Sequence, residues 1–599
     1  MSSISGDLPS FEWIEPVNTS CYGEQPIPAG FSKAVWNLVD KRFHDVAVSA
    51  EKWERFSNPR LAYVGRPFDM PGVEDAARRI IKAIDENGEI LVFGDFDCDG
   101  VTATALLVDM IRACGGKVSH FIPVRAEGYG LSDVAVARAL SQVHPSLFIT
   151  VDCGMGAGEA LQGILDKGID VIVSDHHLPG APLPKECIVV STHSEGVPLE
   201  CEGLCGAGVA FKIACGVVIS KYPTNDDLGK AIRMRLFSWL DALAIATIAD
   251  VVPLTGENRL IAQLGMERLS KAPRLGLKRL MLEVFSSEQS LTKITSQHIG
   301  FILAPHINAA GRISSAEAAL ALLLSEDADE ARKNAIALKQ ANACRRSEDS
   351  RLEREAREII NAGTDFVVER DGAVVVAKKG WPAGVIGLCA SHLSEAYHRP
   401  AVVFSLDDNG LARGSVRAPS GYNAYEALSE CSSCIVKFGG HSGAAGLVIE
   451  EANLSQFREA FSHACKRQVG SLFLRPKLSI SGWLDSESFD ASLISSIHKL
   501  EPFGEGNPKP VWGIKGVEVK ATKVGKSEPY SLQLSFKFKD GFELPGIWFH
   551  AGERFKEFSS CSLWDFAGEL MEDWSQGMLR LKLSVIDARR SCNPMKIEE

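Results

Sequence analysis

The chain has 599 residues and a formal net charge of −12, because 76 Asp and Glu residues outnumber 64 Lys and Arg residues. This length predicts several domains, since a single hydrophobic core stops growing at roughly 250–300 residues. The acidic balance argues against a protein that coats nucleic acid, although an enzyme can still bind a few phosphates locally. No apolar run approaches the ~20 residues of a membrane span, and the polar start does not resemble a signal peptide.

Fifteen cysteines, an odd number, are scattered along the chain. The lone CxxC pair, Cys431 and Cys434, lacks a second pair at the spacing of a zinc site. This pattern favours reduced thiols over a zinc site or a disulfide framework, and reduced thiols are typical of the cytoplasm. We therefore expect a cytoplasmic protein that does not contact a membrane.

Residues 1–70 are rich in Pro and Trp, and we predict an irregular N-terminal extension there. From about 75 to 265, short apolar runs that suit strands alternate with segments that suit helices. Strands are predicted at 90–93, 118–124, 147–151 and 171–173, and helices at 101–113 and 131–142. Such alternation predicts a parallel sheet with right-handed crossover connections.

Three of these apolar runs end in acids or histidines: GDFDCDG at 94–100, VDCG at 151–154 and SDHH at 174–177. Ligands of open α/β sheets bind beyond the carboxyl ends of the strands, so these side chains should converge in one crevice. Like charges this close raise one another's pKa unless cations neutralise them. The sequence therefore predicts a metal site, with Asp97 and Asp99 as ligands and Asp95 as a supporting acid.

The donor types narrow the choice of metal. Carboxylates suit Mg²⁺, Ca²⁺ or Mn²⁺, a single imidazole shifts the preference toward Mn²⁺, and zinc would favour Cys and His. So many acids can hold two ions roughly 3.5–4 Å apart, as phosphatases and nucleases do. Asp250 follows an apolar stretch, 238–249. The residues around Asp250 fit either a metal ligand or a structural acid at this position.

Two other interpretations of these motifs compete with metal binding. Gly154, Gly156 and Gly158 imitate a dinucleotide fingerprint, but their spacing is G-x-G-x-G and Asp152 would repel a pyrophosphate. Asp175 could cap a helix beside a buried histidine. Two adjacent histidines, His176 and His177, after an apolar strand favour metal or phosphate binding instead.

The second half of the chain changes character twice. Residues 325–362 contain no Gly or Pro and predict one long helix, of the kind that bridges domains. A second α/β unit follows from about 366 to 468, with strands predicted at 373–377, 401–405 and 445–449.

From about residue 475 the pattern predicts β structure. Leu532, Leu534 and Phe536 alternate with polar residues, and Asp540-Gly541 is a hairpin signal. Further strands are predicted at 545–549, 562–570 and 579–587. A small antiparallel barrel of the oligonucleotide-binding (OB) type and a generic β-sandwich both fit this pattern.

Several motifs resemble a known family, the DHH phosphoesterases, in their order along the chain. The first four are GDFDCDG, VDCG, SDHH and ATIADVVPL, at 246–254. The later ones resemble the single-stranded-DNA-specific exonucleases of that family: LAPHINAAGRI (303–313), GVIGLCAS (384–391), RGSVRA (413–418), FGGHSGAAG (438–446) and EPFGEGNPKPVW (501–512). The resemblance extends from about residue 70 to 590.

The resemblance implies a role for each matching residue. The implied metal ligands are Asp97, Asp99, Asp152, His176 and Asp250. His177, Arg312, Asn308 and Asp95 would serve catalysis, and Arg125, Ser415, Arg417 and His441 would bind the strand, the first three at its 5′-terminal phosphate. The sequence departs from the family pattern at two positions, since the family often has Arg at the position of His306 and His at the position of Pro382. A role of these two residues in substrate contact is therefore in doubt.

The expected architecture is two α/β lobes joined by a long helix, followed by an OB-type β-barrel. The expected divisions are an N-terminal extension (1–70), a DHH catalytic domain (71–324), a connecting helix (325–362), a DHH-associated domain (363–470) and an OB-fold domain (471–591).

The implied activity is 5′→3′ hydrolysis of single-stranded DNA to 5′-mononucleotides with two Mn²⁺ or Mg²⁺ ions, in DNA repair and recombination. A helicase and a single-strand-binding protein are further expected partners. The alternatives are a phosphodiesterase of short oligonucleotides or cyclic dinucleotides, and a non-catalytic single-strand-binding relative.

Overall fold

The computed structural model describes residues 11–16, 27–127, 130–285, 292–313, 315–363, 371–469, 475–526, 528–559, 563–575 and 578–591. The chain forms two compact units. One contains Met1–Pro59, Arg475–Phe503 and Asn507–Glu599, and the other contains Arg60–Leu474 and Gly504–Gly506. Within the described ranges, no helix is both long enough and apolar enough to span a membrane.

The larger unit begins with a five-stranded, fully parallel sheet in the order β3-β2-β4-β5-β6. The strands are β2 (Glu89–Gly94), β3 (Lys117–Phe121), β4 (Leu147–Val151), β5 (Asp170–Asp175) and β6 (Ile188–Ser191). β4 pairs with both β2 and β5, so the carboxyl ends of these three strands are neighbours. The predicted parallel sheet is confirmed.

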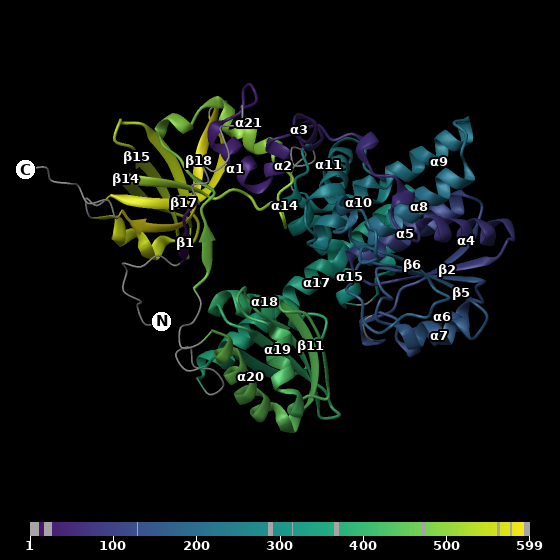
Figure 1. The fold of residues 1–599 in the computed structure, drawn as a ribbon. Coiled ribbons are helices and arrows are strands. Elements are labelled where there is room, and N and C mark those ends of the chain that lie inside the picture. Colours follow the sequence, from purple (N-terminus) through teal and green to yellow (C-terminus); the bar gives the residue numbers. More distant parts are fainter. Residues whose placement is uncertain are drawn as a thin grey trace, which may run out of the picture. The chain divides into compact units, whose positions relative to one another are not determined.

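Helices cover both faces of this sheet (Figure 1). On one face, α4 (Val73–Asp85), α5 (Cys98–Ala113) and α8 (Gly206–Lys221) pack with Ile90 and Val92 of β2. On the other, α6 (Asp133–Gln142) and α7 (Gly158–Leu165) pack with Leu91 and Phe93. Successive side chains of a strand point to opposite faces, so a stretch buried on both faces must be apolar, as residues 90–93 of β2 are.

More helices extend the core on the first face. They are α9 (Asp227–Ser238), α10 (Leu240–Ala249), α11 (Gly256–Lys271), α12 (Leu275–Val284), α14 (Ser296–His298), a π-helix (Ile299–Leu303), α15 (Ala304–Ile313) and α16 (Glu317–Leu324). The predicted long helix is confirmed as α17 (Ala328–Asn361), which has 34 residues. Asp327 caps its N-terminus, since the carboxylate of Asp327 accepts the N–H groups of Asp329 and Glu330.

After α17 comes a second sheet in the order β10-β11-β9-β8-β7, in which only β7 and β8 are parallel. Its elements are β7 (Val374–Lys379), α18 (Ile386–Tyr397), β8 (Ala401–Leu406), β9 (Leu411–Arg417), α19 (Ala424–Glu430), β10 (Lys437–Gly440), β11 (Ala444–Glu450) and α20 (Leu454–Val469). β9 and β10 were not predicted. The buried positions of β9 include Ala412 and Gly414, which are too small for a clear hydrophobic alternation.

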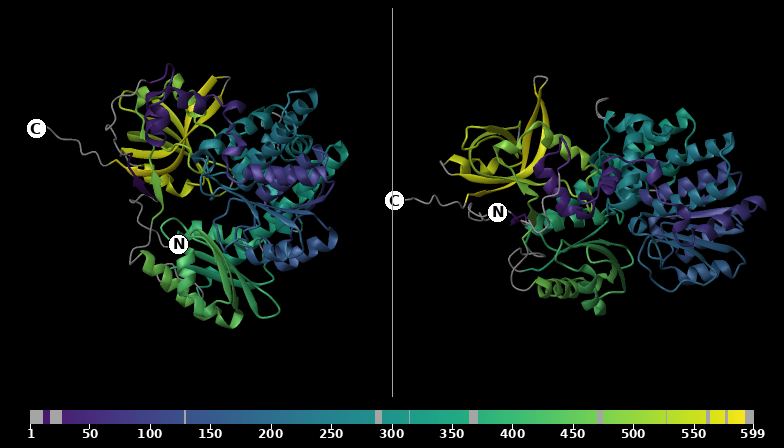
Figure 2. Two further views of the ribbon diagram at one scale, coloured as in Figure 1. Left: turned by 45° about the vertical axis from the view of Figure 1, so that its right-hand side comes forward. Right: turned by 45° about the horizontal axis from the view of Figure 1, so that its top comes forward.

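The smaller unit contains a closed five-stranded barrel, which Figure 2 shows from two further directions. Its strands are β14 (Trp512–Val524), β15 (Ser531–Lys537), β16 (Glu543–Trp548), β17 (Trp564–Ser575) and β18 (Met578–Arg590). The pairing of β17 with β14 closes the sheet on itself. The predicted barrel is therefore confirmed, and the β-sandwich alternative is excluded. The barrel is not antiparallel throughout as predicted, because β16 and β18 pair in parallel, while its other four strand pairs are antiparallel. Two short elements, β13 (Gly482–Trp483) and α21 (Ala491–Lys499), precede it.

The prediction that residues 1–70 are irregular was wrong for the described part of this stretch. It forms β1 (Glu12–Ile14), α1 (Lys33–Arg42), α2 (His44–Ala47) and α3 (Ala50–Ser57). β1 pairs in parallel with β12 (Lys477–Ser479), and Val35, Trp36 and Val39 join the hydrophobic core of the barrel. The apolar face of α1 is short, and much of the core that buries it lies more than four hundred residues later, so local pattern did not reveal it.

Candidate metal centre and strand-binding residues

Asp97 and Asp99 lie where β2 turns into α5. The Oδ1 atom of Asp97 accepts the backbone N–H groups of Asp99 (3.0 Å) and Gly100 (3.1 Å) and so caps α5. The carboxylate of Asp99 accepts the N–H groups of Gly206 (2.6 Å) and Ala207 (2.8 Å) at the start of α8. Both acids therefore lie at helix N-termini, where the helix dipole stabilises negative charge.

Asp152 follows β4 directly and adopts a left-handed backbone conformation, with φ of +59°. Its side chain is buried against Gly206. A Cβ atom at position 206 would lie 2.6 Å from Oδ1 of Asp152, so a side chain there would displace the carboxylate. The glycine that opens α8 thus allows two acids, Asp99 and Asp152, to approach the same point.

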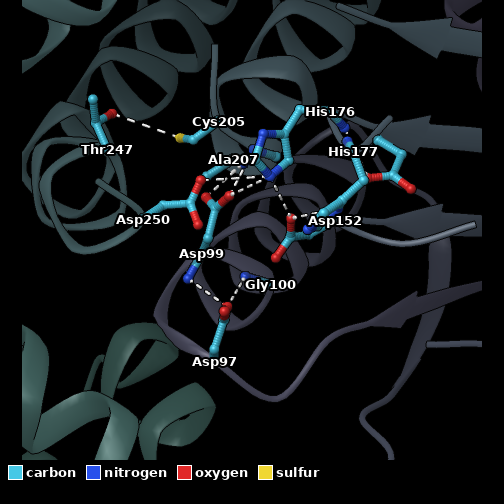
Figure 3. Close-up of polar contacts among 12 residues, drawn as sticks. Asp97, Asp99, Gly100, Asp152, His176, His177, Cys205, Ala207, Thr247 and Asp250 are labelled. Atoms are coloured by element: carbon cyan, nitrogen blue, oxygen red, sulfur yellow. Dashed lines mark hydrogen bonds and ion pairs between the residues drawn. The ribbon is translucent and has the colours of Figure 1, made fainter. Parts of the chain in front are cut away.

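The imidazole of His176 lies among three carboxylates from different parts of the chain (Figure 3). Its Nε2 atom is 3.2 Å from Oδ1 of Asp152, 3.5 Å from Oδ2 of Asp250 and 3.8 Å from Oδ2 of Asp99. Asp250 reaches the cluster from the C-terminal end of α10. The structure therefore brings together four of the five predicted ligands around one imidazole nitrogen, and the fifth, Asp97, caps the adjoining helix.

The donor atoms of this cluster fit a cation. Four buried atoms lack a hydrogen-bond partner among the described residues: Oδ1 of Asp95, Oδ1 of Asp152, Nε2 of His176 and Oδ2 of Asp250. Three overlapping triads have ligand atoms within 4.8 Å of one another: Asp99, His176 and Asp250; Asp95, Asp97 and Asp152; and Asp152, His176 and His177. Buried polar atoms without partners are costly, and divalent cations with oxygen and imidazole ligands would satisfy them.

Burial and mutual repulsion perturb these acids strongly. Burial, aided by the charges of Asp99 and Asp97, raises the pKa of Asp250 to about 9. Burial and the charge of Asp97 raise the pKa of Asp95 to about 8. The pKa of Asp152 is also raised well above its ordinary value by burial and four neighbouring aspartates. Without a cation the cluster resists full ionisation, which is the electrostatic signature of a metal centre.

Asp175, at the end of β5, orients both histidines. Its Oδ1 atom accepts hydrogen bonds from the backbone N–H groups of His176 (2.8 Å) and His177 (3.1 Å). The same atom accepts a hydrogen bond from the ring nitrogen Nδ1 of His177 (2.8 Å). Oδ2 accepts the N–H of Met155 at 2.9 Å. Burial acts to raise the pKa of Asp175, but these hydrogen bonds outweigh it and lower the pKa overall. Sequence analysis expected Asp175 in the same crevice but did not include it among the ligands or catalytic residues, although an acid directly before two histidines was a usable signal.

α15 packs against the turn between β2 and α5. Oδ1 of Asn308 accepts the N–H of Cys98 at 2.7 Å, and the carbonyl of Gly311 accepts Nε of Arg125 at 3.1 Å. The Arg125 guanidinium lies 4.1 Å from the ring centre of Phe96. These contacts place Asn308 and Arg125 beside the acidic cluster, where the charges of Asp95 and Asp97 partly offset the lowering of the Arg125 pKa by burial.

Arg312 links α15 to the segment between β7 and α18, since its Nη1 atom donates to the carbonyl of Gly384 at 3.3 Å. On β9, Nη1 of Arg417 donates to Oγ of Ser415 at 3.1 Å and to the carbonyl of Val416 at 2.8 Å. Burial lowers the pKa of Arg312 to about 10, and the neighbouring charges of Arg125, Arg345 and Arg417 contribute to this shift. Arginines from several elements therefore gather near Arg312.

Three predicted positions lie at the edges of this arrangement. His441 is exposed in the turn between β10 and β11, and its N–H donates to Ala444, which pairs with Arg417. Within the described residues, no hydrogen bond or ion pair joins its side chain to the other predicted site residues. His306 lies on α15, with its ring between α15 and α17. The carbonyl of Pro382 accepts the N–H of Val385 ahead of α18.

Three family models match successive parts of the chain. The DHH family N-terminal domain matches residues 89–247, the DHHA1 domain matches 371–467 and the RecJ OB domain matches 480–587. The single-stranded-DNA-specific exonuclease RecJ of Bacillus subtilis is 34% identical over 546 residues, a match that covers 90% of this chain and 66% of that protein. The protein of the same name from Haemophilus influenzae is 31% identical over 495 residues, which covers 82% of this chain and 85% of that protein.

The chain belongs to the RecJ family. The fold agrees with the crystal structure of RecJ in complex with Mn²⁺ from Thermus thermophilus, with a TM-score of 0.75 and 27% identity. That comparison covers 97% of this chain and 79% of the other. The resemblance and the RecJ fold expected from sequence are therefore confirmed, and the role of each site residue stays a prediction.

Proposed function

We propose that this RecJ-family protein is a metal-dependent, single-stranded-DNA-specific exonuclease. It hydrolyses phosphodiester bonds in the 5′→3′ direction, releases 5′-mononucleotides and serves DNA repair and recombination. The observation that carries the proposal is the convergence of Asp99, Asp152, His176 and Asp250 in a chain with DHH, DHHA1 and RecJ OB domains. Asp152, His176 and Asp250 each contribute a buried atom without a hydrogen-bond partner among the described residues.

The proposed metal ligands are Asp97, Asp99, Asp152, His176 and Asp250, with Mn²⁺ or Mg²⁺ as the ions. The number of acids within reach of one another supports two ions rather than one. Bound divalent cations of this type lower the pKa of water and offset charge on the leaving oxygen.

The chain's own residues complete the chemistry. Asp175 accepts a hydrogen bond from the proton on Nδ1 of His177. Burial acts to lower the pKa of His177, but the hydrogen bond and the charge of Asp175 outweigh it and raise the pKa, so Nε2 can also carry a proton and donate to a phosphate oxygen. Arg312 supplies a permanent positive charge for the transition state, and Asn308 fixes the turn that carries the acids. Asp95 supports the cluster as a neighbouring acid.

Arg125, Ser415 and Arg417 are proposed to bind the 5′-terminal phosphate, and His441 to contact the strand. Guanidinium groups suit this task because they donate two parallel hydrogen bonds to a phosphate. The barrel is proposed to bind the strand through stacking and phosphate contacts, as OB folds do. A helicase and a single-strand-binding protein remain proposed partners, and the cytoplasm remains the proposed location.

The proposed domain division is the one expected from sequence: 71–324 (catalytic), 325–362 (connecting helix), 363–470 (DHH-associated) and 471–591 (OB fold). The helices within residues 1–70 are proposed to serve as a structural extension of the barrel, since they share its hydrophobic core.

Digestion of end-labelled DNA tests the function. A 5′-labelled single strand should release labelled mononucleotide at once in Mn²⁺, whereas a 3′-labelled strand should yield a ladder of shortening products. A blunt duplex and an EDTA control should stay intact. Cleavage of dinucleotides but not of long strands would favour the phosphodiesterase alternative, and binding without cleavage would favour a non-catalytic relative.

A further inference from the structure

A chain of hydrogen bonds connects α15 with α17 close to Arg312. Nδ1 of His306 lies 2.6 Å from the carbonyl oxygen of Ile302, and its Nε2 lies 3.1 Å from Nδ2 of Asn342. On the other side of the same amide, Oδ1 of Asn342 accepts Nη2 of Arg345 at 2.7 Å. Sequence analysis assigned no role to Asn342 or Arg345 and left that of His306 in doubt.

The partners of His306 determine the direction of every hydrogen bond in this chain. A backbone carbonyl can only accept, so Nδ1 of His306 must carry a proton. In the neutral ring Nε2 is then an acceptor, which requires the NH₂ group of Asn342 to face it and the amide oxygen to face Arg345. Burial, together with the charges of Arg345, Arg346 and Lys339, lowers the pKa of His306 and so favours this neutral ring.

The guanidinium of Arg345 is anchored without being neutralised. The side chain of Arg345 is 15% exposed. Among the ion pairs of the described residues, its one acidic partner is Asp349. Nη1 of Arg345 and Oδ2 of Asp349 are 3.7 Å apart, which is too far for a hydrogen bond. Asp349 also lies 3.8 Å from Nδ1 of His392 on α18. Arg345 therefore keeps donor capacity and positive charge beside Arg312, which already has Arg125 and Arg417 as neighbours. Cations gathered in this way repel one another, and an anion relieves that repulsion.

We propose that Arg345 is a further phosphate-binding residue for the DNA strand, and that Asn342 and His306 are positioning residues that hold its guanidinium. The inference rests on the proposed function, because the anion it assigns is the phosphate backbone of the single strand. The proposal also assigns a role to His306, because its neutral imidazole accepts the hydrogen bond that orients the amide of Asn342.

Binding without catalysis tests the contact. A fluorescent, 5′-phosphorylated oligo-dT is titrated with the protein in EDTA at several salt concentrations, and anisotropy gives Kd. Arg345→Ala should raise Kd by about tenfold, the loss expected for a charge-assisted phosphate contact. The slope of log Kd against log salt should fall by about 0.7, the value for one phosphate contact to a single strand. The matched control is Arg346→Ala, an exposed neighbour on the same helix, which should change Kd less than twofold and leave the slope unchanged.

Double variants test the positioning chain. Asn342→Leu and His306→Leu should each raise Kd by about threefold to fivefold, and neither should weaken binding further once Arg345 is Ala, because coupled residues are not additive. His306→Gln should retain most of the affinity, since its side-chain oxygen can accept from Asn342. Thermal unfolding of each variant shows whether it is folded. If Arg345→Ala is not folded, Arg345→Lys, which keeps the charge but lacks the planar guanidinium, is measured in its place.

Equal salt slopes for Arg345→Ala and wild type, or additive effects in the double variants, would overturn the inference. This failure is distinguishable from failure of the proposed function. In the first case the wild type still digests single strands in Mn²⁺, and in the second it does not.

Discussion

Asp175 and His177 form a hydrogen bond of 2.8 Å between Oδ1 and Nδ1, and the same oxygen accepts the backbone N–H groups of both histidines. Because a carboxylate can only accept, the ring of His177 carries a proton on Nδ1. One buried acid outside the predicted ligand set thus determines how the two histidines face the cluster.

Asp175→Asn should therefore lower kcat by about 100-fold or more, as loss of the acid that orients a catalytic histidine does elsewhere. The amide keeps the size of the side chain but removes the negative charge that raises the pKa of His177, which disfavours the ring with protons on both nitrogens. Steady-state rates on oligo-dT in saturating Mn²⁺ measure the effect, and Kd in EDTA serves as the control for folding and binding. An unchanged kcat would show that Asp175 is only a structural residue.

Asp152→Ala should abolish most turnover yet make the metal-free protein more stable. Removing one carboxylate from a crowded, buried cluster relieves repulsion, so the Tm in EDTA should rise. Addition of Mn²⁺ should raise the Tm of the wild type far more than that of the variant. Differential scanning fluorimetry with and without Mn²⁺ measures both effects, with Glu159→Gln, an exposed acid on α7, as the matched control. Near-normal rates in Mn²⁺ would contradict the proposed metal ligation.

Arg417→Ala should lower kcat/KM on 5′-phosphorylated strands by about tenfold to a hundredfold, since a hydrogen bond to a charged group contributes roughly 1.5–3 kcal/mol. On 5′-hydroxyl strands, which lack the partner, the loss should be much smaller. The measured quantity is the ratio of kcat/KM on the two substrates. Arg413→Ala, on the same strand and exposed, should leave that ratio unchanged. If Arg417→Ala loses the same factor on both strands, the end-binding site lies elsewhere.

Glu355→Gln should destabilise the protein near neutral pH but not in acid. Hydrogen bonds from Trp381 and Lys378 lower the pKa of Glu355 to about 2. A depressed pKa stabilises the folded state above the unfolded-state value, about 4.3 for Glu, and this contribution is lost as the pH falls toward 2. Denaturant midpoints of wild type and variant should therefore differ at pH 7, and the difference should shrink below about pH 4 and vanish near pH 2. Glu358→Gln, exposed on the same helix, is the control, and a difference that persists in acid would contradict the assignment.

Residues 60–469 alone should fold and hydrolyse short oligonucleotides, because the larger unit has hydrophobic cores of its own. Loss of the barrel should weaken binding to long strands and reduce its salt dependence. Removal of the C-terminal part alone should give an insoluble protein, since Val35 and Trp36 would lose their partners. Anisotropy with strands of increasing length makes the comparison, and equal affinity of the shortened and full chains for a long strand would contradict a binding role for the barrel.

Local pattern was sufficient for much of this molecule. The parallel sheet was predictable because short apolar runs alternate with helical segments, and the acids were recognisable because Asp97, Asp152 and His176 each closely follow such a run. The long helix α17 was predictable because no Gly or Pro interrupts it. Resemblance, rather than pattern, singled out Asp250.

The tertiary structure alone decided which distant groups meet. The N–H groups that bind Asp99 belong to α8, more than a hundred residues later, and no spacing in the sequence encodes that contact. The helices within residues 27–57 find their core in the C-terminal barrel, and Asn342 of α17 meets His306 of α15. Periodicity reports which face of an element is buried, but the partner that buries it is selected by the packing of the whole chain.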